Sequence, residues 1–341
     1  MQRLAKLAIL GASVAIVLGA CKSTSVDLAS AQTVNLPLAA FAPTPEEMRA
    51  EQRVVILPPE YDTAAGEYAS RQLYANIEQA LIRSGTRVLE RERAESMAAE
   101  LIAAEQTGQF RTDGPQAANI VLFSRVTNAG WGSSHTARDS YTDRRGNRQT
   151  TPAYCRYSGS VRVQVRAYEL PDMLPIETFD LEGSTSSRED STNRNCPVSD
   201  GHAASLISNA VEDALAQQQT AIANAMAPSF YVTERRNADS GKIALFRITA
   251  DSSRGAQEGR DVEIFRRELR TDTLTQQEYM EEILIASGVI SSQVDRNGSF
   301  VIIRDTDQAD RIQAGDIARI RQGNCPDGYM SILGSCQPSL W

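Results

Sequence analysis

The N-terminus places the strongest constraint on this chain, because two cations there precede a run without charges. Arg3 and Lys6 come before the apolar stretch 7–18, which is the layout of an export signal. The run is too short to remain in a membrane as a spanning helix. We therefore expect the mature chain to fold outside the cytoplasm, where disulfides form and persist.

A cysteine follows the apolar run, in the sequence Leu18-Gly19-Ala20-Cys21. An ordinary secretion signal with a coincidental cysteine is one interpretation. The four residues also resemble the lipobox of bacterial lipoproteins, which implies that the Cys21 thiol is acylated and becomes the new N-terminus. Acyl chains would anchor an otherwise soluble chain, since each buried methylene contributes roughly 0.8 kcal/mol. Lys22 beside the anchor resembles lipoproteins forwarded to the outer membrane, so the predicted location is the outer membrane, facing the periplasm.

The remaining four cysteines form an even set: Cys155, Cys196, Cys325 and Cys336. No two of them have the close spacing of a zinc knuckle, so we predict disulfides and no metal. Three connectivities are possible. We favour Cys155 with Cys196 and Cys325 with Cys336, because the second pair closes a short loop that contains Pro and Gly. Each closure would restrict the unfolded chain by about 3 to 4 kcal/mol.

Length and charge set further bounds. The 341 residues suffice for two domains with their own cores. The formal charge of -8 becomes -10 once the signal and its two cations are removed. An acidic surface argues against nucleic acid and against binding to anionic lipid. Attachment to the membrane is therefore expected through the lipid anchor alone.

Composition and periodicity divide the chain into five segments. They are a signal peptide (1–20), a lipidated tether of partly extended character (21–52), an α/β domain (53–228), a mainly β domain (229–322) and a disulfide-closed tail (323–341). The tether is rich in Ser, Ala and Pro and shows no sustained period. The predicted fold class is thus an α/β domain, with a sheet flanked by helices, followed by a small mainly β domain.

The α/β domain is predicted from alternating strand and helix patterns. Apolar residues recur every four positions over 68–85, and again over 94–108 and beyond Ser199, which predicts three amphipathic helices. β-Branched runs predict strands at 53–57, 86–91, 117–127 and 176–183. In the strand over 161–167, valines and an alanine alternate with Arg and Gln, so one face meets the core and the other meets water.

The mainly β domain contains two similar stretches. Each has a Gly/Asp turn before a closing strand, in "AQEGRDVEIF" and "IQAGDIARI", which indicates two weakly similar halves. Between them lies 273–287, "TLTQQEYMEEILIAS", which we interpret as a helix.

The order of elements behind the lipobox resembles the curli-secretion lipoprotein family, called CsgG-like, and its relatives with a TolB-N-like fold. The segments "LERERAESMAAELIAAEQTG" and "AANIVLF" carry this resemblance, which covers about 53–228. It implies an envelope protein that assembles with copies of itself or with other envelope proteins. The C-terminal β segment resembles the small barrel-like modules that end some flagellar and envelope lipoproteins.

Secretion members of that family form rings in which each subunit donates two β-hairpins to a membrane barrel. The corresponding stretches here are 128–154 and 184–201, and both are polar. A lipid-facing hairpin needs alternate apolar positions, because a charge at the midplane costs roughly 2 to 4 kcal/mol. Neither stretch alternates in this way, and a Cys155 to Cys196 bridge would tie the two together. We expect polar loops here rather than a pore.

Catalytic motifs are scarce. The two histidines, His135 in a polar loop and His202 at a helix start, lie far from any nucleophile motif, and no phosphate-binding Gly-rich loop occurs. Asp305, Asp307 and Asp310 lie close together but lack the EF-hand glycine and glutamate, so we expect a solvated turn. We predict no enzyme activity and no cofactor.

Three arginines, Arg144, Arg145 and Arg148, form a basic loop tip that is either a solvated turn or a partner contact. The leading hypothesis is a non-enzymatic outer-membrane lipoprotein that serves in periplasmic assembly or secretion. Two alternatives stay open. One is an oligomeric CsgG-like secretion channel, and the other is a regulator of a periplasmic cell-wall enzyme.

Overall fold

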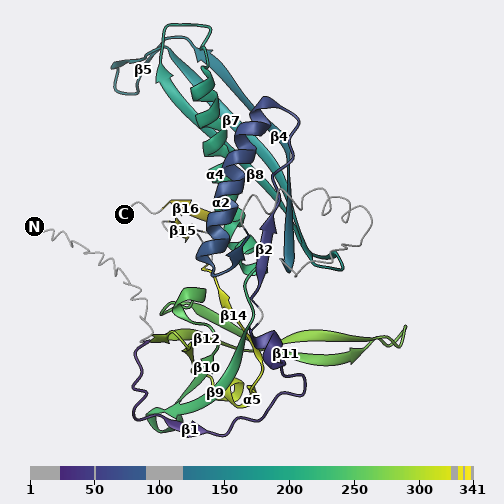
Figure 1. Cartoon of the computed structure of the whole chain (residues 1–341). Coiled ribbons are helices and arrows are strands. Elements are labelled where there is room, and N and C mark those ends of the chain that lie inside the picture. Colours follow the sequence, from purple (N-terminus) through teal and green to yellow (C-terminus); the bar gives the residue numbers. More distant parts are fainter. Residues whose placement is uncertain (1–23, 50, 90–117, 324–328, 333–334, 339–341) are drawn as a thin grey trace, which may run out of the picture.

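The computed structural model describes residues 24–49, 51–89, 118–323, 329–332 and 335–338. As predicted, an α/β part is followed by a strand-rich part. Figure 1 shows the α/β part as a tall, narrow body above the strand-rich part. The expected helix over 94–108, Cys21 and Cys325 lie outside the described residues, so the predicted bridge between Cys325 and Cys336 stays a prediction. Within the described chain, no helix combines the length and apolar character needed to cross a membrane.

The α/β part is built on one five-stranded sheet in the order β3-β2-β4-β7-β8. Its strands are β2 (Arg53–Ile56), β3 (Arg87–Val88), β4 (Ile120–Thr136), β7 (Tyr154–Glu169) and β8 (Leu174–Asp190). β2 lies parallel to β3 and β4, whereas β4, β7 and β8 are antiparallel neighbours over most of their length. These three long strands form the blade.

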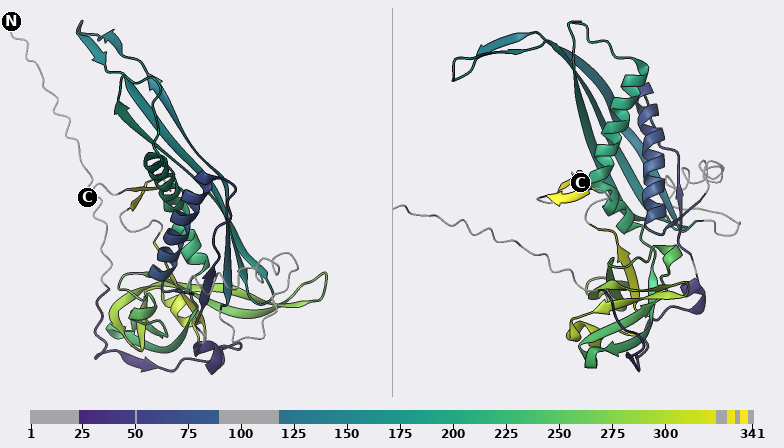
Figure 2. Two further views of the ribbon diagram at one scale, coloured as in Figure 1. Left: turned by 45° about the horizontal axis from the view of Figure 1, so that its top comes forward. Right: turned by 90° about the vertical axis from the view of Figure 1, so that its left-hand side faces the viewer.

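Two long helices, α2 (Ala64–Arg83) and α4 (Asp200–Ala225), cover one face of this sheet, as the right-hand view of Figure 2 shows. The apolar row of α2 predicted from the sequence, which includes Leu73 and Ile77, is fully buried against it. Both helices begin at capping residues, because the side chains of Thr63 and Ser199 accept hydrogen bonds from backbone amides in the first turn.

α4 lies unusually close to the sheet because glycines face it. A Cβ on Gly183 of β8 would stand 2.1 Å from the carbonyl oxygen of Ala210, and one on Gly159 of β7 would stand 2.6 Å from that of Leu206. Such distances leave no room for any side chain at either position. The predicted alternation over 161–167 is also present in β7, whose apolar side chains face the helices and whose polar ones face solvent.

The polar stretches expected to be loops are largely strand, which corrects the sequence interpretation. β4 continues to Thr136 and β8 to Asp190, and a small hairpin of β5 (Asp139–Thr142) and β6 (Arg148–Thr151) extends the tip. The reason is the ladder itself, since β7 supplies backbone partners to both neighbours along its whole length. Polar side chains are tolerated because one face of the blade is solvated.

The second part is a small closed barrel. Its strands are β9 (Phe230–Ala238), β10 (Ile243–Ile248), β11 (Asp261–Thr271), β12 (Glu278–Asp295), β13 (Gly298–Ile303) and β14 (Ile317–Arg321), joined in the order β9-β10-β13-β12-β11-β14 and closed by β14 on β9. Short helices lie between strands: η1 (Asp239–Gly241), η2 (Ser252–Arg254) and α5 (Thr306–Arg311). A separate pair, β15 (Tyr329–Ile332) and β16 (Ser335–Pro338), follows.

The strand pairings give the barrel an internal two-fold relation, in line with the faint repeat in the sequence. Exchanging β9, β10 and β11 for β12, β13 and β14 converts every pairing of the closed barrel into another that is present. The Gly/Asp turns precede β11 and β14, the strands that correspond. Gly259 and Gly315 in these turns both have positive φ, 80° and 92°, a conformation that favours glycine.

The helix expected over 273–287 is wrong. This stretch lies in the turn between β11 and β12 and in β12 itself, and the outer halves of the two strands form a hairpin arm (266–283) that projects from the barrel in Figure 1. The two strands pair without a break from Phe265 with Leu284 to Thr271 with Glu278. Cross-strand pairing therefore overrides a local pattern that is typical of helices.

The expected tether is also corrected, because its described part is bound to the barrel. β1 (Gln32–Val34) pairs with β9, and Leu38 forms a bridge with Ala314. Val26, Leu28 and Ala31 pack against a buried apolar cluster of the barrel. The short helix α1 (Pro45–Arg49) follows before β2 begins. We call residues 24–49 the strap.

The two parts contact one another closely below α2. A Cβ on Gly85, which has a φ of 83°, would stand 2.3 Å from the carbonyl oxygen of Arg254 in the barrel. The backbone amide of Gln322, which follows β14, donates to the side chain of Asn224 in α4. These contacts set the blade on the barrel.

Candidate functional site: the blade and its open edges

The disulfide joins β7 to the loop before α4. Cys155 and Cys196 are bonded and buried, with their Cα atoms 5.6 Å apart, one of the two predicted pairs. Tyr157 and Leu206 belong to the same apolar cluster, and the Ser133 hydroxyl on β4 donates to the Cys196 carbonyl at 2.8 Å. The bridge and this hydrogen bond hold the loop across two strands of the blade, so the upper end of α4 is fixed to the sheet.

Both histidines lie near this disulfide. His135 on β4 is directly opposite Cys155 in the ladder, and its buried Nε2 has no hydrogen-bond partner among the described residues. The His202 ring in the first turn of α4 lies 4.4 Å from the Tyr157 ring, centroid to centroid. The sequence placed His135 in a loop, whereas it belongs to a strand. The contact of His202 with Tyr157, a member of the apolar cluster beside the bridge, fits a packing role for this ring.

The blade has two uncovered edges. In the described chain, β8 pairs with β7 alone, and β4 beyond Val126 also pairs with β7 alone. The amide of Ser184 on β8 donates to the Asp213 carboxylate of α4 at 3.0 Å, so it points away from β7. Antiparallel strands alternate between inward and outward pairs of backbone groups, so Ser186 and Arg188 also direct their amides outward. Uncovered edges of this kind are templates for a further strand.

The solvated face of the blade carries small residues in three adjacent strands. They are Gly130, Gly132 and Ser134 on β4, Ser158 and Ser160 on β7, and Ser184 and Ser186 on β8. Nearer the barrel, Arg162 and Glu182 form an ion pair at 2.8 Å across β7 and β8. Nearer the tip, the Arg188 guanidinium lies 3.7 Å from the centroid of the Tyr154 ring. The described part of this face is therefore polar.

The three arginines named from the sequence lie at the tip, in and beside the turn between β5 and β6. Asp143 accepts hydrogen bonds from the amides of Asn147 and Arg145, which fixes the turn and holds the pKa of its carboxyl below the usual range. Arg144, Arg145 and Arg148 are exposed, and none forms an ion pair with a described residue. Arg148 donates a hydrogen bond to the Ser140 hydroxyl at 3.4 Å, so the tip is an exposed basic patch without ion pairs among the described residues.

The acidic turn has structural roles. Asp305 caps α5 by accepting the amide of Gln308, and Asp310 forms an ion pair with Arg235 at 2.9 Å. Among the described residues, no group of three potential ligands could hold a metal ion. Asp305 and Asp310 are thus engaged by neighbouring groups of the barrel.

A cavity of about 420 Å³ lies where the barrel meets the sheet, and its lining includes the carboxylates of Glu47 and Glu282 and the guanidinium groups of Arg267 and Arg319. Arg319 bonds Glu282 at 2.6 Å, and Arg267 lies 3.7 Å from Glu47 of the strap. Burial raises the pKa of Tyr231 in the same cavity. Because both arginines are already engaged by carboxylates, the cavity fits a junction between the two parts better than a site for an anionic ligand.

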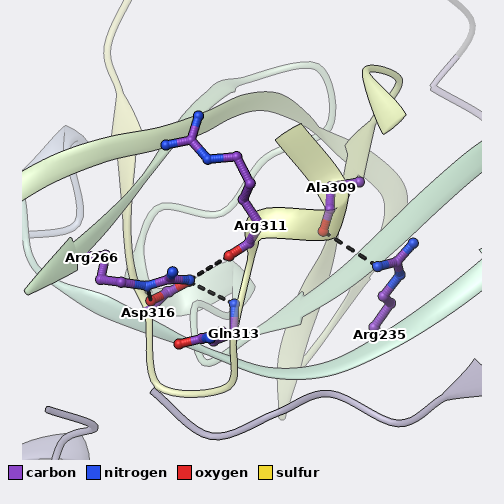
Figure 3. Close-up of polar contacts among 6 residues, drawn as sticks. All are labelled: Arg235, Arg266, Ala309, Arg311, Gln313 and Asp316. Carbon is purple, nitrogen blue, oxygen red and sulfur yellow. Dashed lines mark hydrogen bonds and ion pairs between the residues drawn. The ribbon is translucent and has the colours of Figure 1, made fainter. Parts of the chain in front are cut away.

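A buried ion pair lies inside the barrel (Figure 3). Asp316 is fully buried and accepts hydrogen bonds from Nε and an Nη of Arg266, at 3.0 and 2.8 Å. It also accepts the Gln313 amide at 2.7 Å, while Arg266 donates to the carbonyl of Arg311. The Gly/Asp turn was visible in the sequence as part of a repeat. No local signal in the sequence identified Arg266, which lies 50 residues from Asp316, as the partner of that carboxylate.

The arm exposes large apolar residues. On one of its faces, Leu269 and Met280 are direct cross-strand neighbours and both are close to half exposed, as is Leu284 nearer the barrel. Leu274 at the turn is 92% exposed. The sequence reasoning missed this surface because it assigned the segment to a helix.

No protein-family model matches the chain, and no curated protein sequence matches it. Solved structures that resemble it include lipoprotein GNA1162 from Neisseria meningitidis, with 18% identity, a TM-score of 0.24, and coverage of 47% of this chain and 96% of that one. A minor lipoprotein from Acinetobacter baumannii has 12% identity and a TM-score of 0.25, with coverage of 51% and 92%. A PelC dodecamer from Paraburkholderia phytofirmans has 13% identity and a TM-score of 0.24, with coverage of 54% of this chain and 95% of that one. Two of these neighbours are bacterial lipoproteins by their names, and scores this low carry no argument about this chain.

Proposed function

We propose that this chain is a lipoprotein of the bacterial outer membrane, facing the periplasm, that acts without catalysis in assembly or secretion at the cell envelope. Acylation of Cys21 would attach it to the membrane. Its blade would associate with further copies of the chain or with another envelope protein. The disulfide between Cys155 and Cys196 supports the extracytoplasmic setting, because such bonds persist in oxidising compartments.

The observation that carries the assembly role is the pair of open edges at opposite sides of the blade. β4 and β8 run in the same direction, since each is antiparallel to β7. The edge of β8 in one copy can therefore pair in parallel with the outer part of β4 in the next copy. Such a head-to-tail contact uses two different surfaces and closes into a ring when the rotation between copies permits.

The test is the mass of the protein extracted in mild detergent, compared with variants of the outward-facing residue Ser186. Ser186→Pro removes an outward amide and leaves the ladder to β7 intact, because the lost donor does not point to β7. Ser186→Ala is the matched control, since it keeps the amide. We expect an oligomer for the wild type and for Ser186→Ala, and a smaller species for Ser186→Pro. A strictly monomeric wild type that captures no envelope protein would contradict the proposal.

One observation favours a secretion channel as the second candidate. The blade strands of 16 and 17 residues exceed the roughly 9 to 11 residues that a membrane-crossing strand needs. Their solvated face, however, is polar and carries Arg162 and Arg188. Conductance in planar bilayers by the purified oligomer would support the channel. An oligomer that keeps the Cys155 to Cys196 bridge and gives no conductance would contradict the channel and favour the assembly role.

A further inference from the structure

The strap brings the predicted lipid anchor close to the barrel. The carbonyl of Thr24 accepts a hydrogen bond from the Ser292 amide at 3.0 Å, and its hydroxyl donates to the Glu258 carboxylate. Three residue steps separate Cys21 from Thr24, and a fully extended chain covers about 11 Å in three steps. An acyl group on Cys21 therefore cannot be far from the barrel surface around Ser292.

The strap beyond Thr24 is bound to the barrel, so it does not lengthen the link between Cys21 and the barrel surface. Val26, Leu28 and Ala31 pack against a cluster that contains Phe300. Residues 32–34 then pair with β9, as described above. Side chains at 24, 26 and 28 are half-buried while those between them are exposed, as expected for an extended segment lying on a surface.

We infer that the barrel surface around Glu258 and Ser292 lies against the lipid headgroups of the membrane. This inference rests on the proposed acylation of Cys21. The occupant is the bilayer itself, because an acyl chain must enter it within the reach of those three residues. The protein is thus held at a fixed side of the barrel rather than on a long flexible linker.

This placement also assigns a direction to the arm. The described chain begins on one side of the barrel, and the arm leaves the opposite side in Figure 1 and in the left-hand view of Figure 2. The turn of the arm therefore lies on the side of the barrel away from the bilayer. Its exposed apolar neighbours, including Met280, face the aqueous space and not the lipid.

The experiment uses the full-length lipidated protein in liposomes whose headgroups carry a fluorescence quencher. A fluorescent amino acid replaces Ser292, Leu274 or Arg145 in turn, which marks the strap entry, the arm turn and the blade tip. These three residues are exposed. We expect the fluorophore at 292 to lose most of its emission, and those at 274 and 145 to keep nearly all of it.

A length variant tests whether the short link is the cause. Twenty Gly/Ser residues inserted between Lys22 and Ser23 would add about 25 Å of root-mean-square reach. We expect quenching at 292 to fall sharply in this variant, whereas the same insertion after Gly146 in the blade-tip turn should leave it unchanged. Quenching at 274 that equals or exceeds that at 292, or quenching at 292 that survives the first insertion, would overturn the inference.

Mass spectrometry on the same sample separates this inference from the proposed function. If Cys21 carries no acyl mass, the proposed membrane attachment fails and the inference fails with it. If Cys21 is acylated but all three fluorophores are quenched equally, the proposed function survives and the fixed placement of the barrel is refuted.

Discussion

The buried pair of Arg266 and Asp316 offers the sharpest test of how the barrel is held together. Asp316→Ala removes the acceptor of three hydrogen bonds and leaves a guanidinium that is only 19% exposed without its counter-charge. Breaking a buried pair from one side costs about 3 to 5 kcal/mol. Because Arg266 keeps some solvent and the Arg311 carbonyl, we expect the lower end, about 3 kcal/mol. That corresponds to about two powers of ten in the unfolding equilibrium constant.

The assay is urea unfolding followed by far-ultraviolet circular dichroism, with the slopes of wild type and variant compared first. A matched control exists in the same barrel. Glu281 pairs with Arg270 at 3.1 Å across β12 and β11, but both side chains are about half exposed, so Glu281→Ala should cost less than about 1 kcal/mol. The contrast between Asp316 and Glu281 separates the effect of burial from the mere presence of an ion pair.

A double variant completes the argument. Replacing both partners by apolar residues, as in Arg266→Met with Asp316→Leu, removes the unpaired charge together with the pair. We expect this variant to recover much of the stability lost by Asp316→Ala. A loss below about 1 kcal/mol for Asp316→Ala, or a double variant no better than the single one, would refute the reasoning that an uncompensated buried charge dominates.

Three further perturbations follow from the geometry. Gly183→Ala should destabilise the α/β part by several kcal/mol, because a Cβ there would stand 2.1 Å from a carbonyl oxygen of α4. Thermal unfolding measures this loss of stability, and a variant as stable as the wild type would contradict the close packing. Removing the bridge with Cys155→Ser and Cys196→Ser should cost about 4 kcal/mol for a 41-residue separation, as urea unfolding under oxidising and reducing conditions would show. The hydrogen bond from Arg87 holds the pKa of Glu51 below its ordinary value, so this contribution to stability is present at neutral pH and lost as the pH falls through the folded pKa. NMR titration of the carboxyl should show the low pKa, and Arg87→Ala should return it toward the ordinary range.

Periodic patterns predicted the parts of the fold whose information is local. The four-residue spacing that includes Leu73 and Ile77 predicted α2, and the strict alternation over 161–167 predicted which face of β7 is buried. Both patterns are set by the geometry of a single element against one core, so they can be read without knowing the partner. The pairing of Cys155 with Cys196 needed only an even number of cysteines and a choice among three connectivities.

The failures share a different cause, which is pairing between distant segments. The stretch 273–287 has the composition of a helix, yet most of its residues pair with β11. The polar extensions of β4 and β8 have no apolar period, and only their register with β7 makes them strands. The Arg266 to Asp316 pair spans 50 residues. None of these contacts leaves a periodic mark on the segments that form it.

The strap is another segment whose structure depends on pairing with a distant strand, and this pairing has a functional consequence. β14 covers only Phe230 and Tyr231 on its side of β9, and β1 pairs with Arg235–Asn237 on the same strand. Without the strap, the outer part of β9 would be an open edge beside an uncovered apolar cluster, which is a template for aggregation. The segment that links the predicted anchor to the protein is therefore also part of the barrel wall, so lipid attachment and barrel integrity depend on the same few residues. Under the proposed acylation of Cys21, such a chain would hold its barrel at the membrane and leave the blade edges and the arm free for the proposed partners.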